Sequence, residues 1–352
     1  MPDWTKSMQR TFEYYIVDPD TWKDTQRIDT IISSSISWDL TADTLGSASI
    51  NLTNLLGECY VRFYLITLQN GIRERRSLGT FLVQTPSSTF DGKYRSIQVD
   101  AYTPLIELKE NYPPLGYTIL KNENIMTNAF SLTRTNLRAP VVEAISDKTL
   151  DYNYTTNQDD TWFNFIYDLI TQADYSFDLD ELGRILFAPK QRIEEMSPVW
   201  TFNTDNSSIL TPSVTMNHDI YGIPNVIEVD YTLNGRPYTA KAINNDPMSP
   251  ISTISRGREI TKRITNAQFN GIPTTGMLDE YAAKALREYS KVSYKLSYSH
   301  AYCPVRIGDC VRINYPEAGL ENVKARVVSQ SITCDTSMTV NETAEYSVKL
   351  WG

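Results

Sequence analysis

The chain has 352 residues and is acidic, with 33 Lys and Arg against 42 Asp and Glu and a formal net charge of −9. Its length predicts two or three domains. Nucleic-acid binding depends on clustered Lys and Arg, so this balance argues against a DNA- or RNA-binding protein. No run reaches the roughly 18 apolar residues of a membrane span, and the N-terminus lacks a signal-peptide core. We therefore expect no membrane insertion and a protein made in a cytoplasm or assembled there.

Residues 1–105 alternate between apolar and polar side chains with the period of two that predicts β-strands. Turns such as Asn70-Gly71 and Asp91-Gly92 divide the predicted strands, which cover residues 12–16, 35–40, 47–52, 79–84 and 94–101. Residues 60–68 are instead apolar on both faces. We expect this strand to be central in a domain or covered by another chain.

The apolar–polar alternation that is typical of strands stops at residues 106–198 and again at 235–290. Asp160-Thr161 is a helix N-cap signal, and the apolar residues that follow it recur at helical spacing up to Ala173. A hairpin closed by Gly183 is predicted directly after this helix. A second helix is predicted from Gly276, with its apolar residues on one face. These segments predict a mixed α+β domain.

Four strands are predicted from residue 292 to the end, at 292–300, 311–315, 323–333 and 344–350, with no helix between them. That pattern is typical of an antiparallel barrel or a small sandwich. The isolated β piece at 199–233, which includes a strand at 227–233, is too short to be a domain and is expected to join this block.

The predicted fold class is therefore mainly β with α+β insertions, made of two antiparallel β-barrels and one interleaved mixed domain. The first barrel would hold residues 1–105. The interleaved α+β domain would hold 106–198 and 235–290. The second barrel would hold 199–234 and 291–352.

The sequence has two histidines and four cysteines, and their positions do not predict an active site. His218 follows Asn217 and precedes Asp219, a turn sequence, and no nucleophile motif accompanies it. A zinc site would need His300 with three of the four cysteines, Cys303, Cys310 and Cys334, which lack the paired spacing of zinc ligands. We predict no catalytic, cofactor-binding or metal-binding residues and no enzyme activity.

Two charged clusters also have structural interpretations. The acidic residues 174, 178, 180 and 181 lack the glycine and glutamate positions of a calcium-binding loop, so a hairpin turn is predicted there. The basic run from Arg73 to Arg76 follows the Asn70-Gly71 turn, where a solvated strand edge or a subunit contact is expected.

Three stretches resemble the baseplate hub proteins of contractile-tailed phages and related injection machines. They are Trp38-Asp39-Leu40 followed by residues 46–50, residues 224–229, and residues 305–311. The resemblance implies a structural virion protein of the tail baseplate. It also implies two tube-protein-like barrels per chain, so that a homotrimer presents six barrels to a hexameric tail tube, with a trimeric central spike on the other side.

The same resemblance implies contacts with other baseplate proteins and a central lumen through which DNA passes without specific binding. Three chains carry −27 (3 × −9), and a lumen of that sign would repel phosphate. Contacts between neighbouring barrels would account for the two apolar faces of residues 60–68. Three alternatives stay open: a tail-associated cell-wall hydrolase, a carbohydrate-binding receptor protein, and a distal tail adaptor present in six copies.

Overall fold

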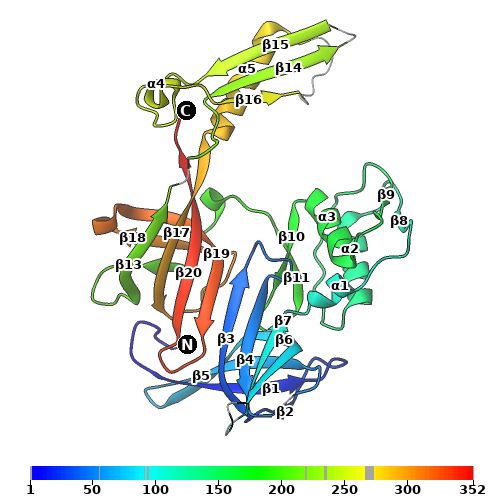
Figure 1. Ribbon diagram of the computed structural model, residues 1–352, viewed down its shortest axis with the longest axis vertical. Helices are drawn as coiled ribbons and strands as arrows, with labels where there is room; N and C mark the ends of the chain where they lie inside the picture. Colours follow the sequence, from blue (N-terminus) through cyan, green and yellow to red (C-terminus); the bar gives the residue numbers. More distant parts are fainter. Residues whose placement is uncertain are drawn as a thin grey trace. The chain divides into compact units, whose positions relative to one another are not determined.

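A computed structural model describes residues 2–54, 56–90, 92, 95–218, 220–233, 236–265 and 273–351 (Figure 1). The chain divides into two compact units. The first holds Met1–Val214 and Tyr298–Thr343, and the second holds Thr215–Ser297 and Ala344–Gly352. Of the helices that the structure describes, none is long and apolar enough to cross a membrane.

Among the described residues, thirteen strands form one large sheet, in the order β13-β17-β20-β19-β3-β4-β7-β6-β5-β1-β2, with β18 added beside β19 and β12 beside β18. Its strands are β1 (Gln9–Val17), β2 (Asp24–Arg27), β3 (Ile31–Asp39), β4 (Gly46–Leu52), β5 (Tyr60–Gln69), β6 (Ile72–Phe90), β7 (Arg95–Tyr102), β12 (Trp200–Phe202), β13 (Leu210–Asn217), β17 (Lys291–Ala301), β18 (Cys310–Tyr315), β19 (Leu320–Thr333) and β20 (Thr339–Lys349). The short 3-10 helix η2 (Pro316–Ala318) lies between β18 and β19.

The strands predicted in the two β blocks are all present, because alternation reports a half-buried strand directly. The Asn70-Gly71 turn joins β5 to β6 with positive φ at both residues, as a tight hairpin of this type requires. The turns predicted at Asp91-Gly92 and Asn234-Gly235 fall on positions 91, 234 and 235, which lie outside the described residues.

Closed barrels are not found among the described residues, where the hydrogen-bonded path is open from β13 to β2. The sheet consists instead of two halves with the same order of neighbours. The N-terminal half-sheet runs β3-β4-β7-β6-β5-β1, and the C-terminal half-sheet runs β13-β17-β20-β19-β18-β12 (Figure 1). Corresponding strands also follow one another in the same order along the chain. The halves differ at their last pair, which is antiparallel for β1–β5 and parallel for β12–β18.

The α+β part of the first unit follows β7. It contains α1 (Ile106–Glu110), β8 (Thr118–Ile119), α2 (Ile125–Asn136), β9 (Tyr154–Thr155), α3 (Trp162–Gln172), the hairpin β10 (Tyr175–Leu179) and β11 (Ile185–Pro189), and η1 (Ile193–Glu195). The predicted helix α3 and its hairpin are confirmed, and the Thr161 side chain caps α3 by accepting the Asn164 N–H. Sequence reasoning missed α2, whose buried side is only Ile125, Met126, Ala129 and Thr133 among Asn, Ser and Thr residues.

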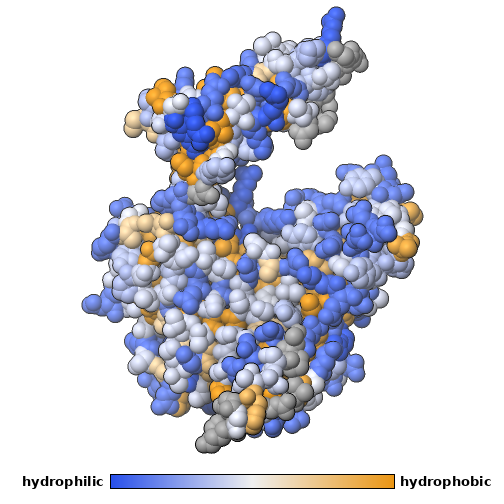
Figure 2. All heavy atoms as spheres, viewed as in Figure 1, coloured by the Kyte–Doolittle hydropathy of each residue, from blue (hydrophilic) through white to orange (hydrophobic). Residues whose placement is uncertain are grey.

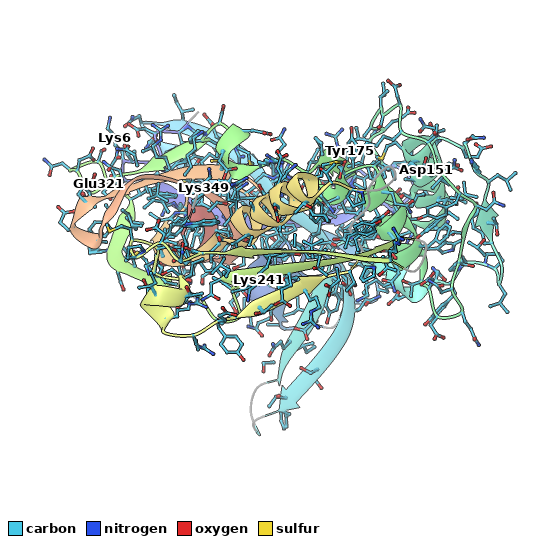
Figure 3. The ribbon with its side chains drawn as sticks, turned by 90° about the horizontal axis from the view of Figure 1, so that it is seen from above. Lys6, Asp151, Tyr175, Lys241, Glu321 and Lys349 are labelled. Carbon is cyan, nitrogen blue, oxygen red and sulfur yellow. The ribbon has the colours of Figure 1, made fainter. Side chains whose placement is uncertain are left out.

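The second unit is built around the small sheet β15-β14-β16. It contains β14 (Val226–Leu233), β15 (Arg236–Ile243), α4 (Thr253–Arg256), β16 (Thr261–Ile264) and α5 (Thr275–Tyr289). Figure 3 shows α5 lying along this sheet. Ile227 and Val229 share a buried core with Leu278, Ala282 and Leu286 of the predicted helix α5.

This arrangement differs from the expected domains in two ways. Residues 226–233 were expected in the second barrel but pair with β15 and β16 instead. The segments 106–198 and 235–290 were expected to join, yet they have separate hydrophobic cores and fall in different units. The physical reason is that β15 pairs with β14, although residues 235–290 were not expected to contribute a strand to it. Helix α5 then covers the apolar face of β14.

Candidate functional site

The residues considered for zinc do not form a ligand set. The Cys303 Sγ lies 3.9 Å from His300 Nδ1, and no group of three metal-ligating side chains occurs in the part of the chain that the structure describes. Burial raises the pKa of the Cys303 thiol and raises the pKa of the Cys334 thiol to about 12. Both thiols are therefore protonated at neutral pH, whereas a cysteine nucleophile needs the thiolate.

His300 belongs to a buried polar cluster that joins three strands of the C-terminal half-sheet. The Glu342 carboxylate on β20 accepts a hydrogen bond from the Tyr298 hydroxyl at 2.7 Å and another from the Gln330 amide at 2.6 Å. His300 Nε2 lies 3.2 Å from the same carboxylate but outside hydrogen-bond geometry. All four side chains are at most 4% exposed, so the cluster provides hydrogen-bond partners for a buried carboxyl group and offers no access to a substrate.

His218 packs against two tyrosines of the second unit. Its ring centroid lies 4.4 Å from that of Tyr294, and Nε2 lies 3.3 Å from the Tyr346 hydroxyl. Asp219, the other polar neighbour in the sequence motif, lies outside the described residues. These contacts give His218 an aromatic setting and agree with the structural interpretation of the motif.

The acidic residues near position 180 form the predicted hairpin turn. The Asp180 carboxylate accepts the backbone N–H groups of Leu182 and Arg184, which closes the turn. Glu181 pairs with Arg76 at 3.1 Å, and Asp178 lies 3.4 Å from an Arg306 nitrogen. Each of these three carboxylates therefore has partners within the chain, which leaves none of them as an open calcium ligand.

The tip of this hairpin is fixed to the N-terminal half-sheet by the Leu182 carbonyl. That oxygen accepts hydrogen bonds from Trp22 Nε1 at 2.8 Å, Thr80 Oγ1 at 2.9 Å and Arg62 Nη2 at 3.2 Å. Gly183 has φ +75°, and a Cβ there would lie 2.7 Å from the Thr80 Cβ. A larger residue at 183 would push the tip away from β6, so glycine is required by both conformation and space.

Arg62 is the central side chain of this contact and is 4% exposed. Besides Leu182, it donates to Thr80 Oγ1 at 2.8 Å and forms an ion pair with Asp24 at 2.9 Å. A cavity of about 40 Å3 lies beside the hairpin and is lined in part by Arg76 and Arg306. The contact is therefore a structural joint.

Both faces of β5 are buried inside the chain from Tyr60 to Thr67, so the first of the two expected possibilities, a strand central in its domain, is the one found. Contacts between neighbouring barrels are not needed to explain its apolar faces. On one face Tyr60 packs against Trp22, with ring centroids 4.8 Å apart. On the other face Phe63 packs against Phe81 at 5.3 Å. The two-sided apolar pattern marks a strand between β1 and β6 that is covered on one side by the sheet interior and on the other by the α+β part.

The basic run after the Asn70-Gly71 turn is also engaged within the chain. Arg73 pairs with Glu13 at 2.8 Å, and Arg75 pairs with Asp24 at 3.1 Å while lying over the Tyr64 ring. This result matches a solvated strand edge whose charges are balanced locally.

A face rich in Ser and Thr runs across the strands that connect the two half-sheets. We call it the polar face; it comprises Ser33, Ser35, Ser37, Asp39, Ser47, Ser49, Asn51, Ser87, Thr89, Ser96, Gln98, Asp100, Ser329, Ser331 and Thr333. Hydrogen bonds cross it, from Asn51 to Ser33 at 2.8 Å and from Gln98 to Ser49 at 3.3 Å. Figure 2 shows mostly pale spheres, the colour of Ser and Thr, over β3, β4 and β19.

The polar face carries few charged side chains. Its charged members are the two aspartates, and it includes no Lys or Arg. The opposite face of the same strands is apolar, with Ile36, Ile50 and Val99 fully buried. Such a surface can contact water or pass a polyanion, but it lacks the cations that would hold phosphate.

Comparison with solved structures finds this fold in phage tail proteins. The tail protein from Neisseria meningitidis MC58 superimposes with a TM-score of 0.64 at 12% identity, over 96% of this chain and 96% of its own. The 43 kDa tail protein of prophage MuSo2 from Shewanella oneidensis gives 0.64 at 11% identity, over 97% of this chain and 98% of its own. No protein-family model matches, and the search of curated proteins found no match.

A third neighbour comes from a secretion machine. The E. coli c3393 protein is described as a component of the type VI secretion system with structural similarity to the T4 bacteriophage tail proteins gp27 and gp5. It superimposes with a TM-score of 0.51 at 8% identity, over 92% of this chain and 76% of its own. At these identities the likeness concerns the fold. The chain therefore has the fold of phage tail proteins, and its resemblance to hub proteins is confirmed at that level.

Proposed function

We propose that this chain is a structural protein of a phage tail baseplate, where a homotrimer acts as the hub between a hexameric tail tube and a trimeric central spike. The observation that carries this proposal is the fold shared with tail proteins over nearly the whole chain. The similarity that the E. coli secretion component has to gp27 and gp5 supports a place next to a spike. In this proposal the protein resides in the virion tail, is assembled in the host cytoplasm, and contacts other baseplate proteins.

The paired half-sheets support the symmetry of the proposal. A hexameric tube needs six similar surfaces, and a trimer supplies them only if each chain holds two. The N-terminal and C-terminal half-sheets have the same strand order, so three chains would present six similar sheets. In this arrangement the half-sheets replace the two closed barrels that the sequence predicted.

The polar face is proposed to line the DNA channel. Ser and Thr side chains offer neutral hydroxyl groups, and the two aspartates repel phosphate, so DNA would slide without being held. A triple variant, Ser33→Lys, Ser49→Lys and Ser331→Lys, should fold normally because these positions are at least partly exposed and no two of them lie directly opposite each other. The assembled variant should retain DNA in a salt-dependent way, while lysines placed at exposed positions on η1 should not. Equal DNA retention by both variants would exclude the polar face as the channel lining.

The decisive experiment is mass measurement in solution, followed by symmetry determination from averaged particle images of the assembled hub. Three copies per ring with six similar sheets is the expected result. Six copies per ring would instead indicate a distal tail adaptor. Cell-wall lysis by the purified chain in a zymogram would favour a tail-associated hydrolase and contradict a purely structural role.

A further inference from the structure

The β5–β6 pair of the N-terminal half-sheet matches the β18–β19 pair of the C-terminal half-sheet over the first four residues of β5 and β18. Each ladder shifts its register directly after these four residues. In each pair the next N–H on the second strand, that of Val83 or Val327, donates to the carbonyl of the residue just before the first strand. On this alignment Arg312, the third residue of β18, is the counterpart of Arg62, the third residue of β5.

The two arginines differ in their partners. Arg62 is buried, forms an ion pair with Asp24 at 2.9 Å, and donates to the Thr80 hydroxyl and to the Leu182 carbonyl. Arg312 is half-buried, and its Nε is shielded from solvent without a hydrogen-bond partner. Among the residues that the structure describes, Arg312 forms no ion pair. The C-terminal half-sheet therefore keeps the cation but lacks the groups that neutralise it in the N-terminal half-sheet.

A backbone segment packs on each pair of strands in a similar way. In the N-terminal half-sheet the Thr80 hydroxyl, opposite the arginine, donates to the Leu182 carbonyl at the hairpin tip. Its counterpart on β19, Lys324, donates to the carbonyls of Glu194 and Met196, in η1 and directly after it, at 3.3 and 3.0 Å. The segment at η1 thus takes the place of the hairpin tip. It satisfies the lysine but gives the neighbouring arginine no acceptor.

A second arginine without a counter-ion, Arg326, lies on the same face of the sheet. It is two residues from Lys324 along β19, and side chains two apart on a strand point to the same side. The Nε of Arg326 is also buried without a hydrogen-bond partner, and within the described part of the chain this residue forms no ion pair. We call this surface of two guanidinium groups and one ammonium group the cationic face; it comprises Arg312, Lys324 and Arg326.

Arg326 also lines a cavity of about 180 Å3, next to Met196. Two carboxylates line the same cavity, but both are engaged with Arg306. Asp178 lies 3.4 Å from the Arg306 guanidinium group, and Asp309 accepts the Arg306 backbone N–H at 2.8 Å. Of the described residues around this cavity, Arg326 is therefore a cation that is left without a counter-ion. An acidic side chain entering the cavity would neutralise it.

We propose that the cationic face binds an acidic loop of another baseplate protein, whose carboxylates meet Arg312 and Arg326. The N-terminal half-sheet shows the chemistry, because there a carboxylate and a main-chain carbonyl neutralise the equivalent arginine. Three cations on a chain of net charge −9 are few for a phosphate backbone, which favours an acidic protein over nucleic acid. This inference rests on the proposed function and says where a neighbour of the hub would attach.

Replacement by methionine distinguishes a binding arginine from a structural one. Arg62→Met removes a satisfied cation and should destabilise the chain. Arg312→Met removes a shielded donor that has no partner, so the free energy of unfolding should stay the same or rise. Urea unfolding of the full chain measures both. A loss from Arg312→Met as large as the loss from Arg62→Met would show that Arg312 acts within the fold, and would overturn the proposal.

Binding is measured by fluorescence anisotropy at low salt with a labelled hexaglutamate peptide. The unmodified chain should bind the peptide, and the double variant R312Q/R326Q should bind it about tenfold more weakly, or worse. The matched control R73Q/R263Q loses the same charge from two exposed arginines that are already paired, and should bind normally. Equal binding by all three chains, or binding by none, overturns the proposal. Tighter binding of a DNA oligonucleotide of equal charge at the same residues would assign the face to nucleic acid instead.

Mass measurement in solution separates this inference from the hub proposal. A trimer whose peptide binding does not depend on Arg312 and Arg326 overturns the cationic face as a binding site and leaves the hub standing. A monomer that binds the peptide through these residues supports the binding site and contradicts the trimer. Circular dichroism of each variant confirms that it has folded.

Discussion

Replacing Arg62 by Met tests whether the docked hairpin depends on one buried cation. Methionine keeps the aliphatic volume but removes four contacts: the ion pair with Asp24 and the hydrogen bonds to Thr80, Trp22 and Leu182. Removing one partner of a buried ion pair costs about 3–5 kcal/mol when the other charge is left alone. Here Asp24 keeps its ion pair with Arg75, and the Leu182 carbonyl keeps the hydrogen bonds from Trp22 and Thr80, so the loss should not exceed the lower end of that range. The Asp24 side chain is 21% exposed and can be rehydrated in part, which favours the lower end of that range.

The matched control is Arg73→Met, since Arg73 also pairs with a carboxylate but is 61% exposed. Exposed pairs of this kind contribute about 0.2–1 kcal/mol. Urea unfolding followed by tryptophan fluorescence measures both free energies, and hydrogen exchange at residues 180–184 reports release of the hairpin tip. If Arg62→Met destabilises the chain no more than Arg73→Met does, the hairpin is held by something other than Arg62.

Three further outcomes follow from the same packing. Gly183→Ala should destabilise the chain more than Gly116→Ala, which shares a positive φ but has open space and should cost about 1–2 kcal/mol; equal losses in thermal unfolding would contradict the steric argument. Burial raises the pKa of Tyr302 to about 12, so the folded chain binds this proton more tightly than the unfolded chain, and stability should fall as pH rises above about 10. A flat stability curve across that range would refute this. Glu342→Ala leaves two buried donors unpaired and should cost roughly 2–6 kcal/mol, against little for exposed Glu321→Ala, in denaturant titrations.

Local features of the candidate surfaces could be predicted from the sequence, because each depends on neighbours along the chain. The alternation at Ser35 and Ser37, and at Ser47 and Ser49, identified strands with one polar side. The turn at Gly183 followed from residue type alone. Sequence reasoning missed α2, where Thr and Asn residues weaken the helical period. It also left open whether β5 is central in a domain or covered by another chain, and the structure shows that Trp22 and Phe81 cover its two faces within the chain.

The amino-acid sequence by itself determined where most strands of the large sheet and the helices α3 and α5 lie, and which side of those strands faces water. Side-chain period fixes a face, and a face needs no knowledge of the partner strand. Only the tertiary structure decided which strands pair. It placed β3 beside β19, β14 in a separate small sheet and the hairpin tip on Arg62. Pairing depends on backbone hydrogen bonds between residues up to hundreds of positions apart, and backbone groups are the same in every residue except proline.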